Sequence, residues 1–217
     1  MCLSPEADIV AALAIGIVAV DTLRRNANPD ARALAAIPAI FAGHSLLSAL
    51  MWWNLRGHIP AEFGSIATNL YILVAFVLWP IYIPLALRQM ETRTIRRNVL
   101  LVSCCLGAII GGLNLWFLAT GRIVATEHPW YVGFVTPALP MYLGGLYGVA
   151  TCLSMFVSSH NELKWWGLVN LIGISAIVVW ARHGLPSVWC FWAAITSVFI
   201  NWFIRHHSRQ HRENVRN

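Results

Sequence analysis

His44 lies in the middle of a long uncharged stretch of this 217-residue sequence, between Ala33 and Leu55. Ser48 and Trp52 follow it at steps of four, which places all three side chains on one face of a helix. An ionisable group inside an apolar segment is costly unless it is neutral and hydrogen-bonded, so it indicates a functional site by default. The pattern predicts a binding face around His44 and Ser48. The structural alternative is a neutral imidazole satisfied by serine or asparagine side chains.

A second group of reactive side chains belongs to segments expected on the opposite side of the membrane from the basic loops. Cys2, His183 and Cys190 combine ligand types that suit zinc or copper. Two cysteines facing an oxidising compartment can instead form a disulfide between Cys2 and Cys190. The sequence contains neither Cys-x-x-Cys nor His-Glu-x-x-His, so the metal site rests on topology alone. Asn69 and Asn201 are further ligand candidates within apolar segments.

Two prolines four residues apart, Pro80 and Pro84, interrupt another apolar segment. Each removes a backbone donor and weakens or kinks a helix. We expect a hinge or a cavity wall there, with a plain bend as the alternative. A retinal cofactor is not expected, because the only lysine, Lys164, begins a predicted helix at the membrane surface.

The elements that carry these residues follow from composition. Hydrophobic residues make up 58% of the chain, charged residues 11%, and the mean hydropathy is +0.64, which indicates an integral membrane protein. The apolar runs are continuous and lack the alternation of a barrel strand, so each predicts a spanning helix. We predict an all-α polytopic fold, a single bundle over residues 1–205 with a basic tail at 206–217. The seven expected spans are 7–23, 34–55, 63–87, 96–119, 141–159, 164–182 and 186–205.

The basic residues predict an orientation. With seven spans, twelve of the fifteen Lys and Arg residues fall on one side, and only Arg56, Arg122 and Arg182 fall on the other. The positive-inside rule then places the N-terminus outside and the C-terminus in the cytoplasm. We expect a multi-pass protein of the bacterial inner membrane, whose partners are the lipid bilayer and, at the basic tail, anionic headgroups. Nucleic acid is not an expected partner, and assembly into a homo-oligomer is left open.

Two features bear on access to the bundle interior. Small and polar residues recur at helical spacing in the fourth, fifth and seventh expected spans, where they either line a cavity or allow close helix packing. The longest expected non-helical stretch runs from Thr120 to Pro140 and contains several aromatic residues. We expect it either to lie across the outer mouth as a lid or to anchor a surface loop at the interface.

Four segments resemble an uncharacterised family of small bacterial membrane proteins that begin Met-Cys-Phe-Ser. They are Met1-Cys2-Leu3-Ser4, Trp79-Pro80-x-Tyr82-x-Pro84, Ser158-Ser159-His160 with the following Gly167-Leu-Val-Asn170-Leu, and Ser187-Val-Trp189-Cys190-Phe191. The chain differs from that family at Leu3 and at Gly43-His44-Ser45. The resemblance implies a membrane bundle and directs attention to Cys2, His160 and Cys190, and it implies no activity.

Three classes of function remain. The favoured one is a ligand- or metal-binding bundle, sensory or accessory, with a site that opens to the outer face and holds zinc or copper if a metal is present. The first alternative is an intramembrane, ceramidase-like lipid hydrolase, in which histidines and a carboxylate would hold a metal that activates water. The second is a small-molecule transporter, although the two halves of the chain lack matching polar or proline positions.

Overall fold

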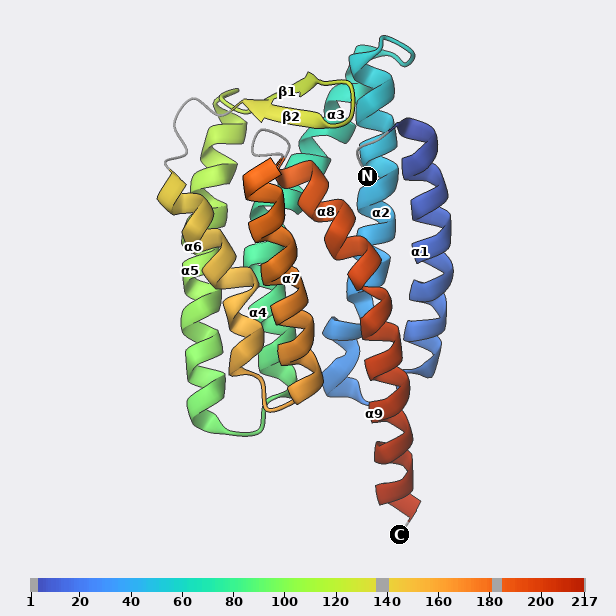
Figure 1. Ribbon diagram of the computed structural model, residues 1–217, viewed down its shortest axis with the longest axis vertical. Helices are drawn as coiled ribbons and strands as arrows, with labels where there is room; N and C mark the ends of the chain where they lie inside the picture. The colour runs from blue at the N-terminus through green and yellow to red at the C-terminus, as the bar shows by residue number, and fades with distance from the viewer. Residues whose placement is uncertain (1–3, 136–140, 181–184, 217) are drawn as a thin grey trace.

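The computed structural model describes residues 4–135, 141–180 and 185–216, and these residues form a bundle of helices with one β-hairpin (Figure 1). The predicted helical class is confirmed. In chain order the elements are α1 (Pro5–Arg25), the 3-10 turn η1 (Pro29–Ala31), α2 (Arg32–Leu55), α3 (Ala61–Ile72), the π-helical segment η2 (Leu73–Leu78), α4 (Trp79–Met90), α5 (Thr94–Ala119), β1 (Val124–Glu127), β2 (Val132–Val135), α6 (Met141–Thr151), the 3-10 segment η3 (Leu153–Val157), α7 (Asn161–Trp180), α8 (Leu185–Thr196) and α9 (Val198–Arg216).

The first helix shows how local sequence sets the limits of these elements. The Ser4 side chain accepts a hydrogen bond of 3.2 Å from the Ala7 amide, which caps the N-terminus of α1. Arg24 and Arg25 occupy its last turn, where positive charge favours the C-terminal end of a helix. α1 then packs along α2, and α9 lies beside α1 and extends past the other helices at one end of the bundle (Figure 1).

Five helical segments among the described residues are long and apolar enough to cross a membrane. α3, η2 and α4 run together as one of them, and a shorter apolar helix covers Gly144–Val157. α1 is not among the five. α9 continues to Arg216, so the last helix runs through most of the expected basic tail at 206–217. The five segments are Pro29–Leu55, Ala61–Met90, Thr94–Ala119, Asn161–Val179 and Val188–Ser208.

The two prolines that the sequence singled out lie in α4, directly after the π-helical segment η2. Because Pro80 has no amide hydrogen, the carbonyl of Phe76, four residues earlier, lacks its usual helical donor. The Asn114 side chain of α5 donates to that carbonyl at 3.2 Å. The Tyr147 hydroxyl of α6 donates to the preceding carbonyl, of Ala75, at 2.6 Å. The irregular segment is therefore stabilised by side chains from two neighbouring helices.

α5 packs closely against this proline segment through its small residues. A Cβ atom added to Gly107 would lie 1.9 Å from the carbonyl oxygen of Pro80, so only glycine allows this approach. The Cys104 thiol lies 3.7 Å from the carbonyl of Ile81 and donates to it. On α5, the stripe that contains these residues and Asn114 thus serves helix packing, the alternative to a cavity lining.

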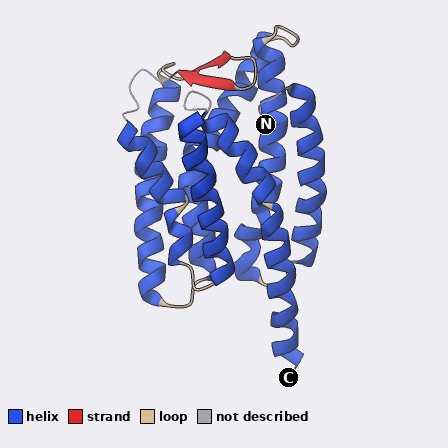
Figure 2. Ribbon diagram, in the orientation of Figure 1, coloured by secondary structure: helices blue, strands red, loops and turns tan. Residues whose placement is uncertain are grey.

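The stretch expected to be non-helical between Thr120 and Pro140 contains an antiparallel hairpin that the sequence did not predict. β1 pairs with β2 with Glu127 opposite Val132 and Ala125 opposite Phe134. The hairpin, red in Figure 2, lies at the end of the bundle where α2 ends and α3 begins, opposite the end from which α9 projects (Figures 1 and 2). We call these the hairpin end and the tail end.

Candidate functional site

The polar face predicted on α2 lies in the interior of the bundle. His44 is 1% exposed, and Ser48 and Trp52 are fully buried. Both imidazole nitrogens of His44, the Ser48 hydroxyl and the Trp52 indole nitrogen lack a hydrogen-bond partner among the described residues. We call these three residues the His44 stripe. Most buried polar groups in proteins are satisfied, so four unpaired polar atoms along one helix face call for an explanation.

Aromatic rings connect the His44 stripe to the neighbouring elements. The Tyr71 ring of α3 stacks on the His44 imidazole with centroids 4.1 Å apart and planes 18° apart. On its other side Tyr71 stacks on Phe134 of β2 at 5.6 Å. The Tyr71 hydroxyl also interacts with the Cys190 thiol of α8, which is 1% exposed. The site is thus formed by α2, α3 and α8 and is covered by the hairpin.

Stacking covers one face of the His44 ring and leaves its nitrogen-bearing edge for hydrogen bonds. In apolar surroundings the imidazole is neutral, with one donor and one acceptor nitrogen. Ser48 both donates and accepts, and the Trp52 indole only donates. Along about 12 Å of helix, at 1.5 Å per residue over eight residues, the stripe therefore offers donors and acceptors without a charge.

A small cavity lies beside the site toward the tail end. Its volume of about 20 Å³ is enough for one water molecule. Phe41, one turn from His44 on α2, forms part of its wall. Cys190 also lines the cavity, and its thiol interacts with the Tyr71 hydroxyl. The other lining residues come from α4, α6, η3 with its N-cap residue Cys152, α7 and α8, and are Trp79, Ile83, Thr151, Cys152, Met155, Trp166, Asn170, Trp189 and Ala193.

Among the other predicted ligand candidates, the described residues Asn69 and Asn201 lie apart from this site. Asn69 is exposed on α3, away from the stripe. Cys2 and His183 lie outside the described residues, as does any Cys2–Cys190 disulfide. Throughout residues 4–135, 141–180 and 185–216, no three His, Cys, Asp or Glu side chains gather closely enough to hold a metal ion.

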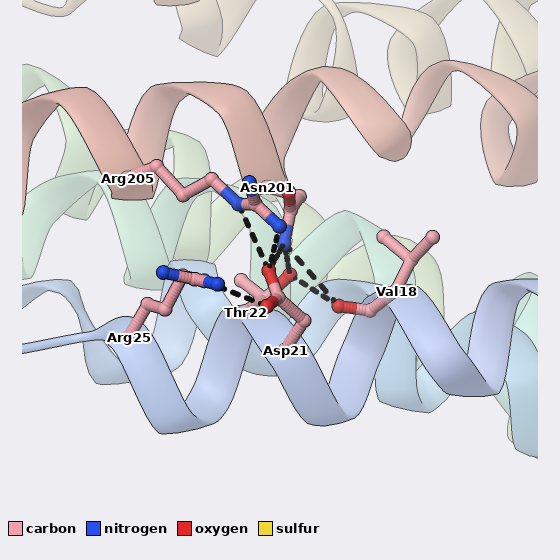
Figure 3. A network of polar contacts seen from close by, with 6 residues as sticks. All are labelled: Val18, Asp21, Thr22, Arg25, Asn201 and Arg205. Atoms are coloured by element: carbon pink, nitrogen blue, oxygen red, sulfur yellow. Dashed lines mark hydrogen bonds and ion pairs between the residues drawn. The ribbon is translucent and has the colours of Figure 1, made fainter.

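Asn201 has a structural role near the tail end instead (Figure 3). Its side-chain amide donates to the Asp21 carboxylate at 2.7 Å and lies 2.8 Å from the Thr22 hydroxyl, both on α1. Arg25 and Arg205 both bind the same Asp21 carboxylate, each at 2.6 Å. Asn201 and Arg205 therefore join α9 to α1, which accounts for this partly buried amide without a ligand.

A buried carboxylate that the sequence analysis missed lies at the tail end. Glu91, 2% exposed, accepts hydrogen bonds from the Ser158 hydroxyl at 2.9 Å and from the Ser159 amide at 2.5 Å. The Ser159 hydroxyl also donates to it, and Arg96 lies 4.0 Å away. Burial raises the pKa of Glu91, but these hydrogen bonds and the Arg96 charge outweigh burial and hold the pKa below its usual value. Glu91 lies in the charged turn between α4 and α5, outside the apolar runs, so the helical periodicity of the sequence did not indicate it.

The comparisons with known proteins place the chain in a family without assigning an activity. No curated protein and no solved structure matches it. The family of unknown function DUF6629 matches residues 1–215, in agreement with the expected membership of an uncharacterised family. The chain therefore belongs to the DUF6629 family.

Proposed function

We propose that this protein spans the bacterial inner membrane seven times, with its N-terminus outside and its C-terminus in the cytoplasm. Five long apolar helices support the membrane assignment, and α1 together with the α6–η3 segment would supply the two further spans. The excess of Lys and Arg on the tail-end side of the expected spans supports the orientation. The hairpin end then faces outward.

We infer that the protein binds a small, uncharged, polar ligand at the His44 stripe, as a sensory or accessory bundle. The observation that carries this proposal is the set of unpaired polar atoms on His44, Ser48 and Trp52. An unpaired buried polar group costs about 1–3 kcal/mol, and a bound molecule that pairs with several of them recovers that cost. No charged ligand is favoured, because the stripe itself carries no charge to compensate one.

The polar donors and acceptors also favour a ligand over a resident metal ion. A zinc or copper site requires three or four converging ligands, and His44 and Cys190 supply two within the described chain. Metal bound to the purified protein would therefore contradict the organic ligand. With only two candidate ligands within the described chain, no observation specifically favours a metal-dependent hydrolase.

The test is to identify what remains bound to protein purified gently from its native membrane. Released small molecules are measured by mass spectrometry and metals by elemental analysis, for the unmodified protein and for His44→Ala. Ser45→Ala is the matched control, because Ser45 is equally buried but donates to the Phe41 carbonyl at 2.8 Å. We expect a near-stoichiometric organic compound in the unmodified protein and in the control, and its loss from His44→Ala. The same amount of bound compound in all three proteins would refute the proposal. A stoichiometric metal in place of an organic compound would also refute it and would identify the site as a metal site.

We further propose that anionic lipid headgroups are partners of the end of α9. This helix extends beyond the other helices (Figure 1), and its sequence from Arg205 onward is rich in arginine and histidine. Each basic residue near an anionic surface contributes about 1 kcal/mol of attraction. Stronger binding of the protein to phosphatidylglycerol than to phosphatidylcholine, lost on neutralising these arginines, is the expected result.

A further inference from the structure

We propose that the β-hairpin is a lid over the His44 stripe, held closed by one ion pair and one aromatic stack, and that a ligand reaches the site when the hairpin lifts. The inference rests on the proposed binding site and specifies how that site is controlled. It is carried by contacts that connect each strand of the hairpin to a different end of the stripe.

The first strand holds the Trp52 end of the stripe. Glu127, the last residue of β1, accepts a hydrogen bond from the Arg56 guanidinium at 2.9 Å. The same guanidinium lies 4.9 Å from the centroid of the Trp52 ring, a cation–π contact. Arg56 thus connects the hairpin to the buried indole, and loss of its ion pair with Glu127 detaches β1 from the Trp52 end of the stripe.

The second strand holds the His44 end. Phe134 of β2 lies nearly parallel to Tyr71, with ring planes 9° apart, and makes an edge contact with Phe76 at 5.7 Å. Tyr71 in turn covers one face of His44. Moving Phe134 away removes the ring that packs on the outer side of Tyr71.

The two attachments act together because the strands are paired. Glu127 is opposite Val132, and Phe134 lies two residues further along the same strand, opposite Ala125. A two-stranded hairpin alone is only marginally stable in water, so its closed position depends on contacts with the bundle. The Arg56 and Glu127 side chains are 34% and 38% exposed, and ion pairs this exposed are weak enough to open reversibly.

Thiol accessibility tests the lid without knowledge of the ligand. Ser48→Cys places a thiol within the stripe, and its rate of modification by a charged, water-soluble methanethiosulfonate is measured in lipid nanodiscs by peptide mass spectrometry. We expect slow modification with the native hairpin. Adding Glu127→Gln should accelerate it about threefold, because an exposed ion pair is weak, and Phe134→Ala about tenfold, equivalent to about 1.4 kcal/mol. Exchanging the charges, with Arg56→Glu and Glu127→Arg together, should restore the slow rate.

The matched control is Arg122→Gln. Arg122 lies over Trp116 at 4.8 Å, the same kind of contact as that of Arg56 with Trp52, but its ring partner belongs to α5 and not to the stripe. We expect this control to leave the rate unchanged. If Ser48→Cys disturbs folding, the native Cys190 thiol beside Tyr71 provides a second reporter.

Two results would overturn the lid. One is a modification rate that the hairpin substitutions do not change, and the other is rapid modification with the hairpin intact. Neither result bears on His44-dependent ligand content, so the lid can fail while the binding site stands. Conversely, an amount of bound ligand that is unchanged in His44→Ala would refute the binding site and leave the accessibility measurements valid.

Discussion

Replacement of Glu91 is expected to destabilise the tail end of the bundle. This carboxylate accepts three hydrogen bonds from Ser158 and Ser159, which join the end of α4 to the turn before α7. Glu91→Ala leaves those donors without their acceptor and Arg96 without its counter-charge. At about 1–3 kcal/mol for each unsatisfied buried group, and with water able to reach the end of the bundle, we expect a loss of about 3 kcal/mol in the free energy of unfolding.

Glu91→Gln is the more informative change, because it keeps the shape and one acceptor oxygen. Hydrogen bonds to a charged acceptor contribute about 1 kcal/mol more than neutral ones, and three are affected. Removing the charge also removes the cost of burying it, which offsets part of the loss. We therefore expect a decrease of about 1–2 kcal/mol at pH 7.

The difference in the free energy of unfolding between the unmodified protein and Glu91→Gln should become smaller as the pH falls. The pKa of Glu91 is lower in the folded protein than in the unfolded chain, where a glutamate has a pKa of about 4.3. The stabilisation from this depressed pKa is therefore complete above about pH 4.3 and is lost as the pH falls through the folded-state pKa. We expect the two proteins to approach equal stability under acidic conditions.

The assay is reversible unfolding in mixed micelles with increasing sodium dodecyl sulfate, followed by circular dichroism at pH 7 and in steps toward pH 3. Glu62→Gln is the control, since Glu62 is an exposed carboxylate in the first turn of α3 and should change stability by less than about 0.5 kcal/mol. Equal unfolding curves for the unmodified protein and Glu91→Gln at pH 7 would refute the assigned role. So would a stability difference that stays constant down to pH 3.

Two further substitutions test helix packing, measured by the same unfolding assay. Gly107→Ala should lower the free energy of unfolding by about 1–3 kcal/mol, because its Cβ would collide with the Pro80 carbonyl. The control Gly112→Ala, with open space around it, should be neutral or stabilising. Equal effects of the two substitutions would contradict the close approach of α5 to Pro80. Asn201→Ala removes the contacts with α1 and should cost about 1–2 kcal/mol, against little change for the exposed Asn69→Ala. A larger effect at Asn69 than at Asn201 would show that the α1–α9 connection is not what holds the amide in place.

Much of the helical structure is encoded locally. Charged residues bound the apolar runs, and a helix in an apolar environment satisfies its own backbone within the run, so few distant contacts are needed to predict it. The expected segment 34–55 lies within α2, and 96–119 lies within α5. The hairpin escaped prediction because its two four-residue strands are paired only with each other, and their sequence gives no strong alternating pattern.

The sequence predicted only part of the candidate site. Spacing alone placed His44, Ser48 and Trp52 on one face, because 3.6 residues per turn fix that relation. Asn69 and Asn201 look alike in the sequence, as polar residues in apolar segments. One is exposed and the other joins two helices, because the rotation of each helix about its axis is set by packing between distant segments.

The amino-acid sequence by itself determined that the chain is helical and apolar, where its charged turns lie, and that an ionisable group is buried in α2. The tertiary structure decided that Tyr71 stacks on His44, that Phe134 covers Tyr71, and that Glu91 is enclosed by Ser158 and Ser159. The physical reason is the range of the interactions involved. Helix formation depends on residues within a few positions of each other, whereas these contacts join residues 27 to 68 positions apart, whose meeting depends on how all the helices pack.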